Sequence, residues 1–304
     1  MALAAFTSSL IKNIPDENIP KEIDLVLDGG AFNGIYMMGS LNYLKQLEKN
    51  NKISIIRVSG CSIGGILGVC YLLDKLDNIL ALCKDCFKYL RKHQVLKKNV
   101  ELFKNYFNET ITDDDLIKIN NKLYLTYFNT HKGKQVMKKK YKSKDHLIDI
   151  LLKSLYIPFL IDNNIIDKDG CVDGAYPYIF KQREDKRKIL FINLQSFSRI
   201  KNMIFIKNEK NIFPRLLEGL MDTHKFFETK KSNNMCSYVN DWNLFNIICF
   251  RLRESIYTFL IYILIFGLKI ENIIPEKWKK DKFVQRHIQI FKRLWRDLIL
   301  YISI

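Results

Sequence analysis

The sequence predicts an α/β fold with a largely parallel sheet, and two successive strand–turn–helix units are the main reason. Residues 23–27 suit a short buried strand and run into a glycine-rich turn, after which apolar residues recur every three or four positions from 34 to 48. Residues 53–58 are rich in β-branched side chains and run into a second glycine-rich turn and another helical pattern over 65–73. Strand–turn–helix twice over indicates βαβ units.

Further strands are expected at 123–128 and 189–194. Between them, Asp169-Gly170 is flanked by apolar residues and predicts a hairpin turn, which leads the chain to Asp173. The lysine-rich run around 138–144 suits an exposed loop.

Composition allows one large domain or a domain with an appendage. The chain has 304 residues, of which 48% are hydrophobic, and this disfavours disorder. Most of its formal charge of +17 comes from residues 181–304, which contain 24 Lys and Arg but only 12 Asp and Glu. A basic surface can attract an anionic membrane or nucleic acid, or be a solvated lysine-rich face. No nucleic-acid motif accompanies the charge, so a nucleic-acid partner is disfavoured.

Cysteine usage and the N-terminus favour an intracellular, reducing compartment. The seven cysteines are an odd number and lie mostly in apolar settings, and the first residues lack the basic start of a secretory signal. Cys83 and Cys86 form one C-x-x-C without a second ligand pair, so a buried helical face is favoured over zinc. No metal or organic cofactor is implied.

The segment Gly60-x-Ser62-x-Gly64 lies between a predicted strand and a predicted helix. Ester hydrolysis by a serine needs a hydroxyl projected from a tight turn at the start of a helix. Glycines two residues on either side remove Cβ atoms that would collide in so sharp a bend. Chance matches to this short motif occur, but the strand before it and the helix after it favour Ser62 as a nucleophile.

Two further motifs fit the same chemistry. The segment from Asp28 to Gly34 is a glycine-rich turn before a helix, and its backbone N–H groups suit a developing oxyanion. The other functional interpretation of this segment is a phosphate-binding loop. It has neither the Walker spacing nor the G-x-G-x-x-G spacing of such loops, so a nucleotide ligand is disfavoured. Asp173-Gly174-Ala175 follows the expected hairpin, which makes Asp173 a candidate general base, although an isolated Asp-Gly is usually a simple turn.

In this order the three motifs resemble the patatin-like phospholipases, over roughly residues 22–200. The stretch from Ser154 to Phe159 and the turn at 132–134 resemble the same family. The resemblance implies a three-layer α/β/α fold with a largely parallel central sheet as a catalytic core at 22–200. Residues 201–304 would then form a basic, partly apolar helical region.

The resemblance also implies roles for individual residues. Ser62 would attack the ester carbonyl, Asp173 would take its proton, and the N–H groups of Gly29, Gly30 and Ala31 would hold the oxyanion. The motif glycines carried over with them are Gly34, Gly60, Gly64 and Gly174. The chain departs from the family pattern at Ala31, where a third glycine is common, and at Asn33, where a Lys or Arg is common.

The C-terminal region contains an apolar run at 255–268 and a basic, aromatic segment at 277–296. As a helix the apolar run would be about 21 Å long, short of the roughly 30 Å of membrane hydrocarbon. A buried or capping helix, a membrane-inserting element and a transmembrane anchor all stay open for it. Trp278, Phe283, Ile288, Phe291 and Trp295 give the following segment the pattern of an amphipathic helix at an anionic interface, or of a core-packed helix.

These observations predict a phospholipase A-like lipid acyl hydrolase that acts on phospholipid or other lipid esters through a Ser–Asp dyad, in the cytoplasm or at a membrane surface. One alternative is an α/β-hydrolase with a Ser–Asp–His triad, in which His224 or His287 follows the aspartate. Another is a lipid- or membrane-binding protein of the same fold without turnover.

Overall fold

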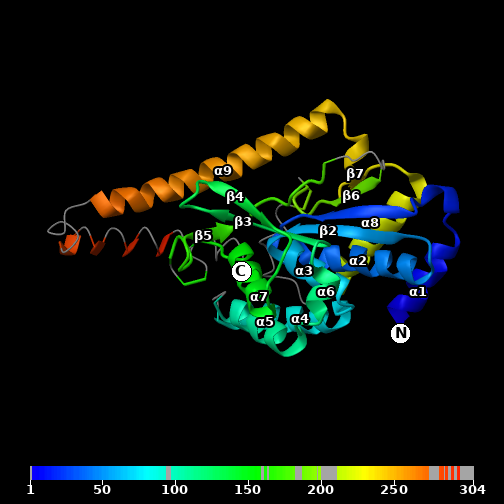
Figure 1. Cartoon of the computed structure of the whole chain (residues 1–304), viewed down its shortest axis with the longest axis horizontal. Coiled ribbons are helices and arrows are strands. Elements are labelled where there is room, and N and C mark those ends of the chain that lie inside the picture. The colour runs from blue at the N-terminus through cyan, green and yellow to red at the C-terminus, as the bar shows by residue number, and fades with distance from the viewer. Residues whose placement is uncertain are drawn as a thin grey trace.

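The computed structural model describes residues 2–93, 97–158, 161–162, 164–181, 187–196, 198–199, 211–273, 281–283, 285–286, 289–290 and 293–294. A seven-stranded sheet lies at its centre, in the order β4-β3-β2-β1-β6-β7, with β5 paired to β3 (Figure 1). The strands are β1 (Glu22–Leu27), β2 (Ser54–Cys61), β3 (Leu123–Asn129), β4 (Lys134–Lys138), β5 (Cys171–Asp173), β6 (Lys188–Ile192) and β7 (Cys236–Tyr238).

The four central strands, β3, β2, β1 and β6, run parallel to one another. The outer strands β4 and β7 and the short β5 pair antiparallel to their neighbours. The largely parallel sheet expected from the sequence is therefore confirmed, with antiparallel additions at its margins.

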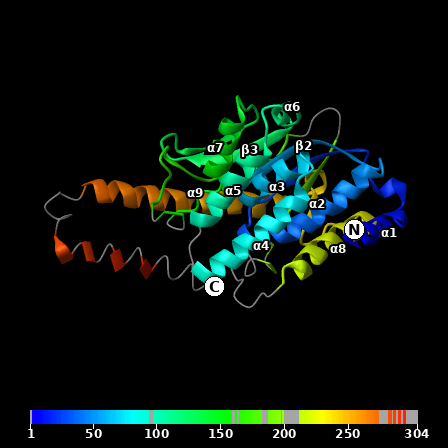
Figure 2. The ribbon, with the colours of Figure 1, turned by 90° about the horizontal axis from the view of Figure 1, so that it is seen from below.

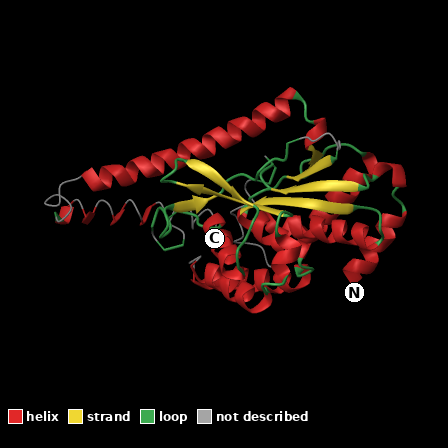
Figure 3. Ribbon diagram, viewed as in Figure 1, coloured by secondary structure: helices red, strands yellow, loops and turns green. Residues whose placement is uncertain are grey.

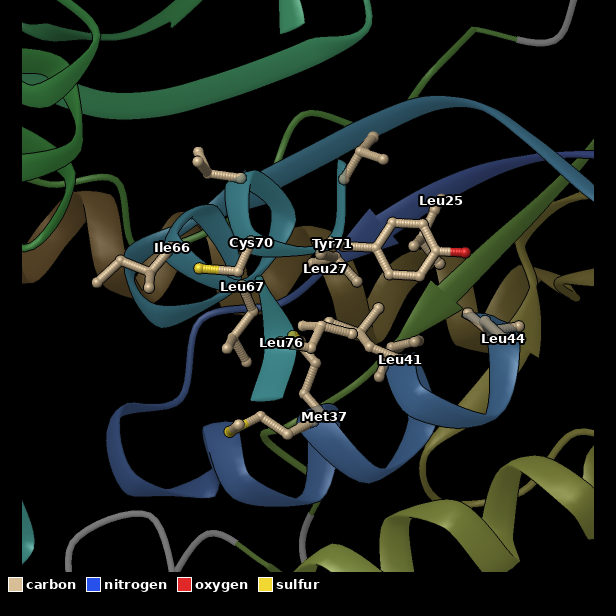
Figure 4. Packing of buried hydrophobic residues seen from close by; sticks show 14 of the residues in the cluster. Leu25, Leu27, Met37, Leu41, Leu44, Ile66, Leu67, Cys70, Tyr71 and Leu76 are labelled. Atoms are coloured by element: carbon tan, nitrogen blue, oxygen red, sulfur yellow. The ribbon is translucent and has the colours of Figure 1, made fainter. Parts of the chain in front are cut away.

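One face of the sheet is covered by several helices (Figures 1 and 2). They are α2 (Gly34–Lys49), α3 (Ser62–Leu72), α4 (Leu76–His93), α5 (Lys97–Thr110), α6 (Asp115–Ile119), α7 (Lys144–Ser154) and α8 (Phe213–Thr229), with α1 (Ala2–Lys12) against α2. Leu25 and Leu27 of β1 point into this layer, where Met37 and Leu41 of α2 and Leu67 of α3 pack (Figure 4). The structure also has short 3-10 turns at η1 (Asp16–Asn18), η2 (Ala31–Asn33) and η4 (Val239–Asp241).

The opposite face of the sheet is covered by α9 (Leu244–Ile273), which runs across it and extends past the sheet (Figures 1 and 3). Successive side chains of a strand point to opposite faces. Val26 therefore points away from its neighbours Leu25 and Leu27, and it joins a second cluster that contains Phe250 of α9. A third cluster joins Phe128 of β3 to Ile261 of α9. Helices thus lie on both faces, which confirms the three-layer α/β/α fold.

Elements beyond residue 200 complete both the sheet and the helical layer. β7 adds a strand to β6, and α8 packs closely against α2. The Ser40 hydroxyl donates to the Gly219 carbonyl at 3.0 Å, and a Cβ on Gly219 would lie 1.9 Å from the Tyr36 carbonyl oxygen. A boundary at residue 200 stays a prediction. Of the aromatic segment at 277–296, Trp278, Ile288, Phe291 and Trp295 lie outside the described residues.

Two expectations outside the sheet can be compared with the structure. Cys83 and Cys86 lie buried on α4, as the sequence predicts. Over the described part of the chain, no helix combines the length and the hydropathy needed to cross a membrane.

Candidate active site

The serine motif forms a sharp turn at the junction of β2 and α3. β2 ends at Cys61, and Ser62 is the first residue of α3 with a φ of 51°. A positive φ is uncommon for a residue with a side chain, and such strain marks the elbow on which serine hydrolases hold a nucleophile. The Ser62 N–H donates to the Ser154 hydroxyl at 2.9 Å, so the end of α7 supports the turn.

Both glycines of this motif lie where no side chain fits. A Cβ on Gly60 would lie 2.6 Å from the Gly64 carbonyl oxygen. A Cβ on Gly64 would lie 2.5 Å from the Asp28 carbonyl oxygen, at the start of the glycine-rich loop. The two loops therefore touch through backbone at the carboxyl ends of the neighbouring strands β1 and β2.

Strand register brings Asp173 to the same place. Cys61 of β2 pairs with Thr126 of β3, and Asp173 of β5 pairs with Tyr127, the next residue of β3. Gly174 allows the close approach, because a Cβ there would lie 2.3 Å from the Thr126 carbonyl oxygen. The turn before β5 forms as expected from Asp169-Gly170: Gly170 has a φ of 69° and its N–H donates to the Asp167 carbonyl at 3.0 Å.

The Asp173 carboxylate accepts a hydrogen bond from the Ala175 N–H at 2.9 Å, and the Ser62 side chain lies beside it. Burial raises the pKa of Asp173 to about 6, although the Ser62 side chain and the Ala175 N–H act to lower it. A carboxylate of this basicity accepts a proton near neutral pH more readily than an exposed aspartate does. Ser62 is itself buried, with 7% of its surface exposed.

The glycine-rich loop lies against the serine turn. A Cβ on Gly29 would lie 3.1 Å from the Cys61 sulfur and 3.4 Å from the Ser62 Cβ. The Gly29 N–H donates to the Asp28 carboxylate at 3.0 Å. The N–H groups of Gly30 and Ala31 make no hydrogen bond to any residue that the structure describes. Ala31 adopts a φ of 44°, in the left-handed region that favours glycine, so the backbone is strained where the family commonly has a third glycine.

The end of this loop is also held by close packing. Gly34 begins α2, and a Cβ there would lie 2.4 Å from the Ile63 side chain. A Cβ on Gly30 would lie 2.6 Å from that of Leu194, after β6. The loop therefore sits between the serine turn and the end of β6.

A buried ion pair joins the loop to α9. Asp28 is fully buried, and its two carboxylate oxygens accept from the two terminal nitrogens of Arg253, at 2.8 and 3.1 Å. Burial raises the pKa of Asp28, while Arg253 and the N–H groups of Leu194 and Gly29 act to lower it. The arginine thus compensates a carboxylate that would otherwise be costly to bury.

Two more side chains of α9 reach the site. The Tyr257 hydroxyl donates to the Gln195 side chain, whose amide nitrogen donates to the Gly29 carbonyl at 3.0 Å. Thr258 lies beside Tyr176, which follows the Asp173-Gly174-Ala175 motif, and acts to lower the pKa of that tyrosine. One turn of α9 therefore spans from the glycine-rich loop to the aspartate motif.

Asn33, at the position where the family commonly has Lys or Arg, forms side-chain hydrogen bonds with three other residues. Its side-chain nitrogen donates to the carbonyls of Leu194 and Arg199, at 2.8 and 3.0 Å. Its side-chain oxygen accepts from Arg215 of α8 at 3.2 Å. A basic group therefore reaches this part of the loop from α8 instead of from the loop itself.

No described histidine bonds to Ser62 or Asp173. His224 is buried on α8, where its ring nitrogen lies 3.1 Å from the Tyr43 hydroxyl. His146 accepts from the Lys142 N–H, and His131 lies beside Gly170. The side chains of His93 and His287 lie outside the described residues.

The neighbouring cysteine is unsuited to nucleophilic attack. Burial, together with the charges of Asp28 and Asp173, holds the pKa of Cys61 well above its ordinary value, so its reactive thiolate is suppressed. Within the described ranges, no group of three or more His, Cys, Asp or Glu side chains is placed to hold a metal ion.

Sequence reasoning missed Arg253, Tyr257, Gln195 and Ser154 as parts of this site. The sequence offered no clear signal for Arg253, because it stands with Arg251 and Glu254 in a charged stretch before the apolar run, and nothing there indicates which charge has a buried partner. The partner itself lies 225 residues away in the chain, and no local pattern links the two.

A serine on a strained strand–helix turn, with an aspartate at its side chain and a glycine-rich loop against it, is the arrangement of a serine hydrolase site. The sequence matches the family model for patatin-like phospholipase over residues 25–178, and the chain belongs to that family. Members of the family are usually hydrolases of lipid esters.

Among solved structures, the chain is similar to VipD from Legionella pneumophila, with 15% sequence identity and a TM-score of 0.32. The similarity covers 57% of this chain and 49% of the VipD chain, so the match spans about half the length of that protein. No curated protein matches the sequence.

Proposed function

We propose that the protein hydrolyses a carboxyl ester of a lipid through an acyl-serine intermediate on Ser62. The observation that carries the proposal is the position of the Ser62 side chain beside the Asp173 carboxyl, whose pKa it acts to lower, at a turn whose backbone is strained. A base in contact with a hydroxyl on such a turn is what activation of a serine nucleophile requires.

In the first half of the reaction, Asp173 takes the proton of the Ser62 hydroxyl while the Ser62 oxygen bonds to the ester carbonyl carbon. The carbonyl oxygen becomes an oxyanion, which the N–H groups of Gly30 and Ala31 stabilise. We assign this role to these two donors because the Gly29 N–H already donates to Asp28. The tetrahedral intermediate collapses, and the leaving alcohol takes the proton from Asp173.

In the second half, water attacks the acyl-serine carbonyl and gives its proton to Asp173. The second tetrahedral intermediate releases the carboxylic acid, and Ser62 regains its proton from Asp173. Each step conserves atoms and charge without a cofactor, and Asp173 alternates between base and acid.

The direct test is covalent labelling of Ser62 by a fluorophosphonate, with hydrolysis of a soluble short-chain ester measured in parallel. Ser62→Ala is expected to abolish both labelling and hydrolysis, and Asp173→Asn to abolish hydrolysis. Asp169→Asn is the matched control, because Asp169 also precedes a glycine but lies exposed on the turn before β5, paired with Lys153. A folded wild-type protein that is neither labelled nor active would favour a lipid-binding protein without turnover.

Histidine substitution separates the Ser–Asp dyad from a triad. His224→Gln, and Ala or Gln at the other four histidines, are each expected to keep turnover within a few-fold of wild type. Loss of a triad histidine would instead cost several orders of magnitude. A folded, inactive variant at any one of the five positions, with Ser62 intact, would overturn the dyad.

A further inference from the structure

α9 has two faces, and only one of them is used by the fold. Phe250, Arg253, Tyr257 and Ile261 follow one another at intervals of three or four residues and point to the body of the protein. Residues with this spacing share one face of a helix. The inner face of α9 is thus fixed on the sheet and on the glycine-rich loop.

The other face of α9 carries a continuous row of exposed apolar side chains, which we call the outer stripe. Each member is between 46% and 71% exposed, and the members follow one another at intervals of three or four residues, apart from the adjacent pair Phe259 and Leu260. The outer stripe consists of Phe245, Ile248, Leu252, Ile256, Phe259, Leu260, Ile263 and Phe266. An apolar surface of this length on a folded protein marks a contact with something else.

Positive charge borders the outer stripe. The Tyr262 hydroxyl donates to the Gly133 carbonyl at 2.7 Å, so the turn between β3 and β4 lies directly beside α9. Lys132 and Lys134, on either side of that glycine, are exposed. An apolar helix face with basic side chains at its edge is typical of a helix that lies in the plane of an anionic lipid surface.

We infer that the outer stripe and the lysines of the β3–β4 turn dock the protein on an anionic lipid surface. The choice of lipid as the occupant rests on the proposed function, because the inner face of the same helix contacts the candidate active site. Apolar side chains of α9 enter the boundary between headgroups and acyl chains, while Lys132 and Lys134 meet the anionic headgroups. The helix then holds Ser62 and Asp173 next to the layer that contains a lipid ester.

The structure provides a native position for a reporter. Six of the seven cysteines are buried, and Cys249, on α9, is exposed. An environment-sensitive fluorophore attached to the native protein therefore labels Cys249 selectively, next to Ile248 of the outer stripe. The Ser62→Ala protein is used so that no lipid is consumed, and neither binding nor fluorescence then depends on turnover. Failure of the docking and failure of the proposed hydrolysis are thereby distinguished.

The probe is a vesicle of equal parts phosphatidylglycerol and phosphatidylcholine, with pure phosphatidylcholine as the comparison. Co-sedimentation is expected with the anionic vesicles, weaker as salt rises, together with a blue shift of the fluorophore. Phe259→Gln/Ile263→Gln is expected to weaken binding about tenfold or more and to remove the blue shift, because two apolar groups no longer enter the lipid.

Charge reversal tests the basic border. Lys132→Glu/Lys134→Glu is expected to weaken binding to anionic vesicles at least about fivefold, with little change for neutral vesicles. The matched control is Lys12→Glu/Lys21→Glu, an equal change of charge at two exposed lysines on α1 and just before β1. If both double variants lose similar affinity for anionic vesicles, net charge alone explains the loss, and the assignment of the β3–β4 turn to the lipid surface is overturned.

Two other outcomes would also contradict the docking. If wild type and the Phe259→Gln/Ile263→Gln variant bind vesicles equally well, lipid is not what covers the outer stripe. A fall in Tm or a change of oligomeric state in that variant, with vesicle binding intact, would show that protein covers the outer stripe. If that variant does not fold, the fluorophore on Cys249 of the otherwise unchanged helix still decides: no blue shift with anionic vesicles overturns the inference.

Discussion

Asp173 must be ionised to take a proton from Ser62, and its pKa of about 6 sets the pH at which this happens. Below that pH the carboxyl is protonated and cannot act as a base. We therefore expect kcat/KM for a soluble ester to rise with pH through about 6 and to level above about 7, with roughly a tenfold loss for each pH unit below the midpoint. A profile that is flat down to pH 4.5 would remove Asp173 as the base.

The same pKa makes a prediction about stability. The carboxyl has a pKa of about 6 in the folded protein against an ordinary pKa of 3.8 when exposed, so the folded state favours its neutral form. The associated stability is present below about pH 4 and is lost as pH rises through 6. Asp173→Asn removes a buried charge above that range. Its Tm at pH 8 is expected to equal or exceed that of wild type, although the variant is inactive.

Gly30 tests the oxyanion loop at the level of a single Cβ atom. Gly30→Ala would place a Cβ 2.6 Å from the Leu194 Cβ, so the loop must shift. Its N–H groups would then no longer point at the oxyanion. We expect kcat for the soluble ester to fall by about 10²-fold, the scale for loss of one oxyanion donor. Gly267→Ala is the control, because a Cβ there meets no atom within 4 Å. Full activity in a folded Gly30→Ala would reduce the loop to a turn.

At the scale of elements, the ion pair between Asp28 and Arg253 makes α9 a positioning element for the loop. Arg253→Gln leaves a buried carboxylate without its partner, which typically costs about 3–5 kcal/mol. The double variant Asp28→Asn/Arg253→Gln removes that charge and should recover most of the lost Tm. We expect both variants to lower kcat more than they change KM, because Arg253 no longer holds in place the side chain that accepts from the Gly29 N–H.

Arg251→Gln provides the comparison for this prediction. Arg251 lies on the same helix, but its side chain is 70% exposed and pairs with Glu254. It should therefore leave kcat unchanged. A double variant that recovers both Tm and kcat would mean that the ion pair serves folding alone.

The sequence predicted those elements whose signals are local. Strands 23–27, 53–58, 123–128 and 189–194 all form, because a buried strand needs only a short β-branched or apolar run. The helix after Ser62 begins three residues earlier than its apolar pattern indicated, since the glycines hide the first turn from a periodicity search. β4 and β7 were not expected, because β4 carries mostly polar side chains and β7 has only three residues.

For the candidate site, the sequence predicted the individual motifs but not the strand pairing that brings them together in space. Ser62 and Asp173 come together through the pairing of β5 with β3, a register that neither segment encodes alone. Arg253 and Tyr257 come from a helix for which the sequence left a buried or capping role, membrane insertion and a transmembrane anchor all open. The donation from Gly29 to Asp28 is a matter of atomic geometry, beyond what residue types can indicate.

At the scale of the whole molecule, the family match ends at residue 178, whereas the folded body continues through α9. A fragment of residues 1–200 would lack α8, whose side chains Leu216, Leu220, Phe226 and Phe227 are at most 1% exposed. Burying four such side chains is worth about 6–12 kcal/mol, which is comparable to the whole stability of a typical domain. The fragment would also lose β7 and expose the sheet face under α9.

We therefore expect residues 1–200 to show no cooperative thermal unfolding by circular dichroism and no fluorophosphonate labelling, whereas residues 1–273 retain both. A cooperative melt and a labelled Ser62 in the shorter fragment would establish the boundary at residue 200 and make α8, β7 and α9 an appendage.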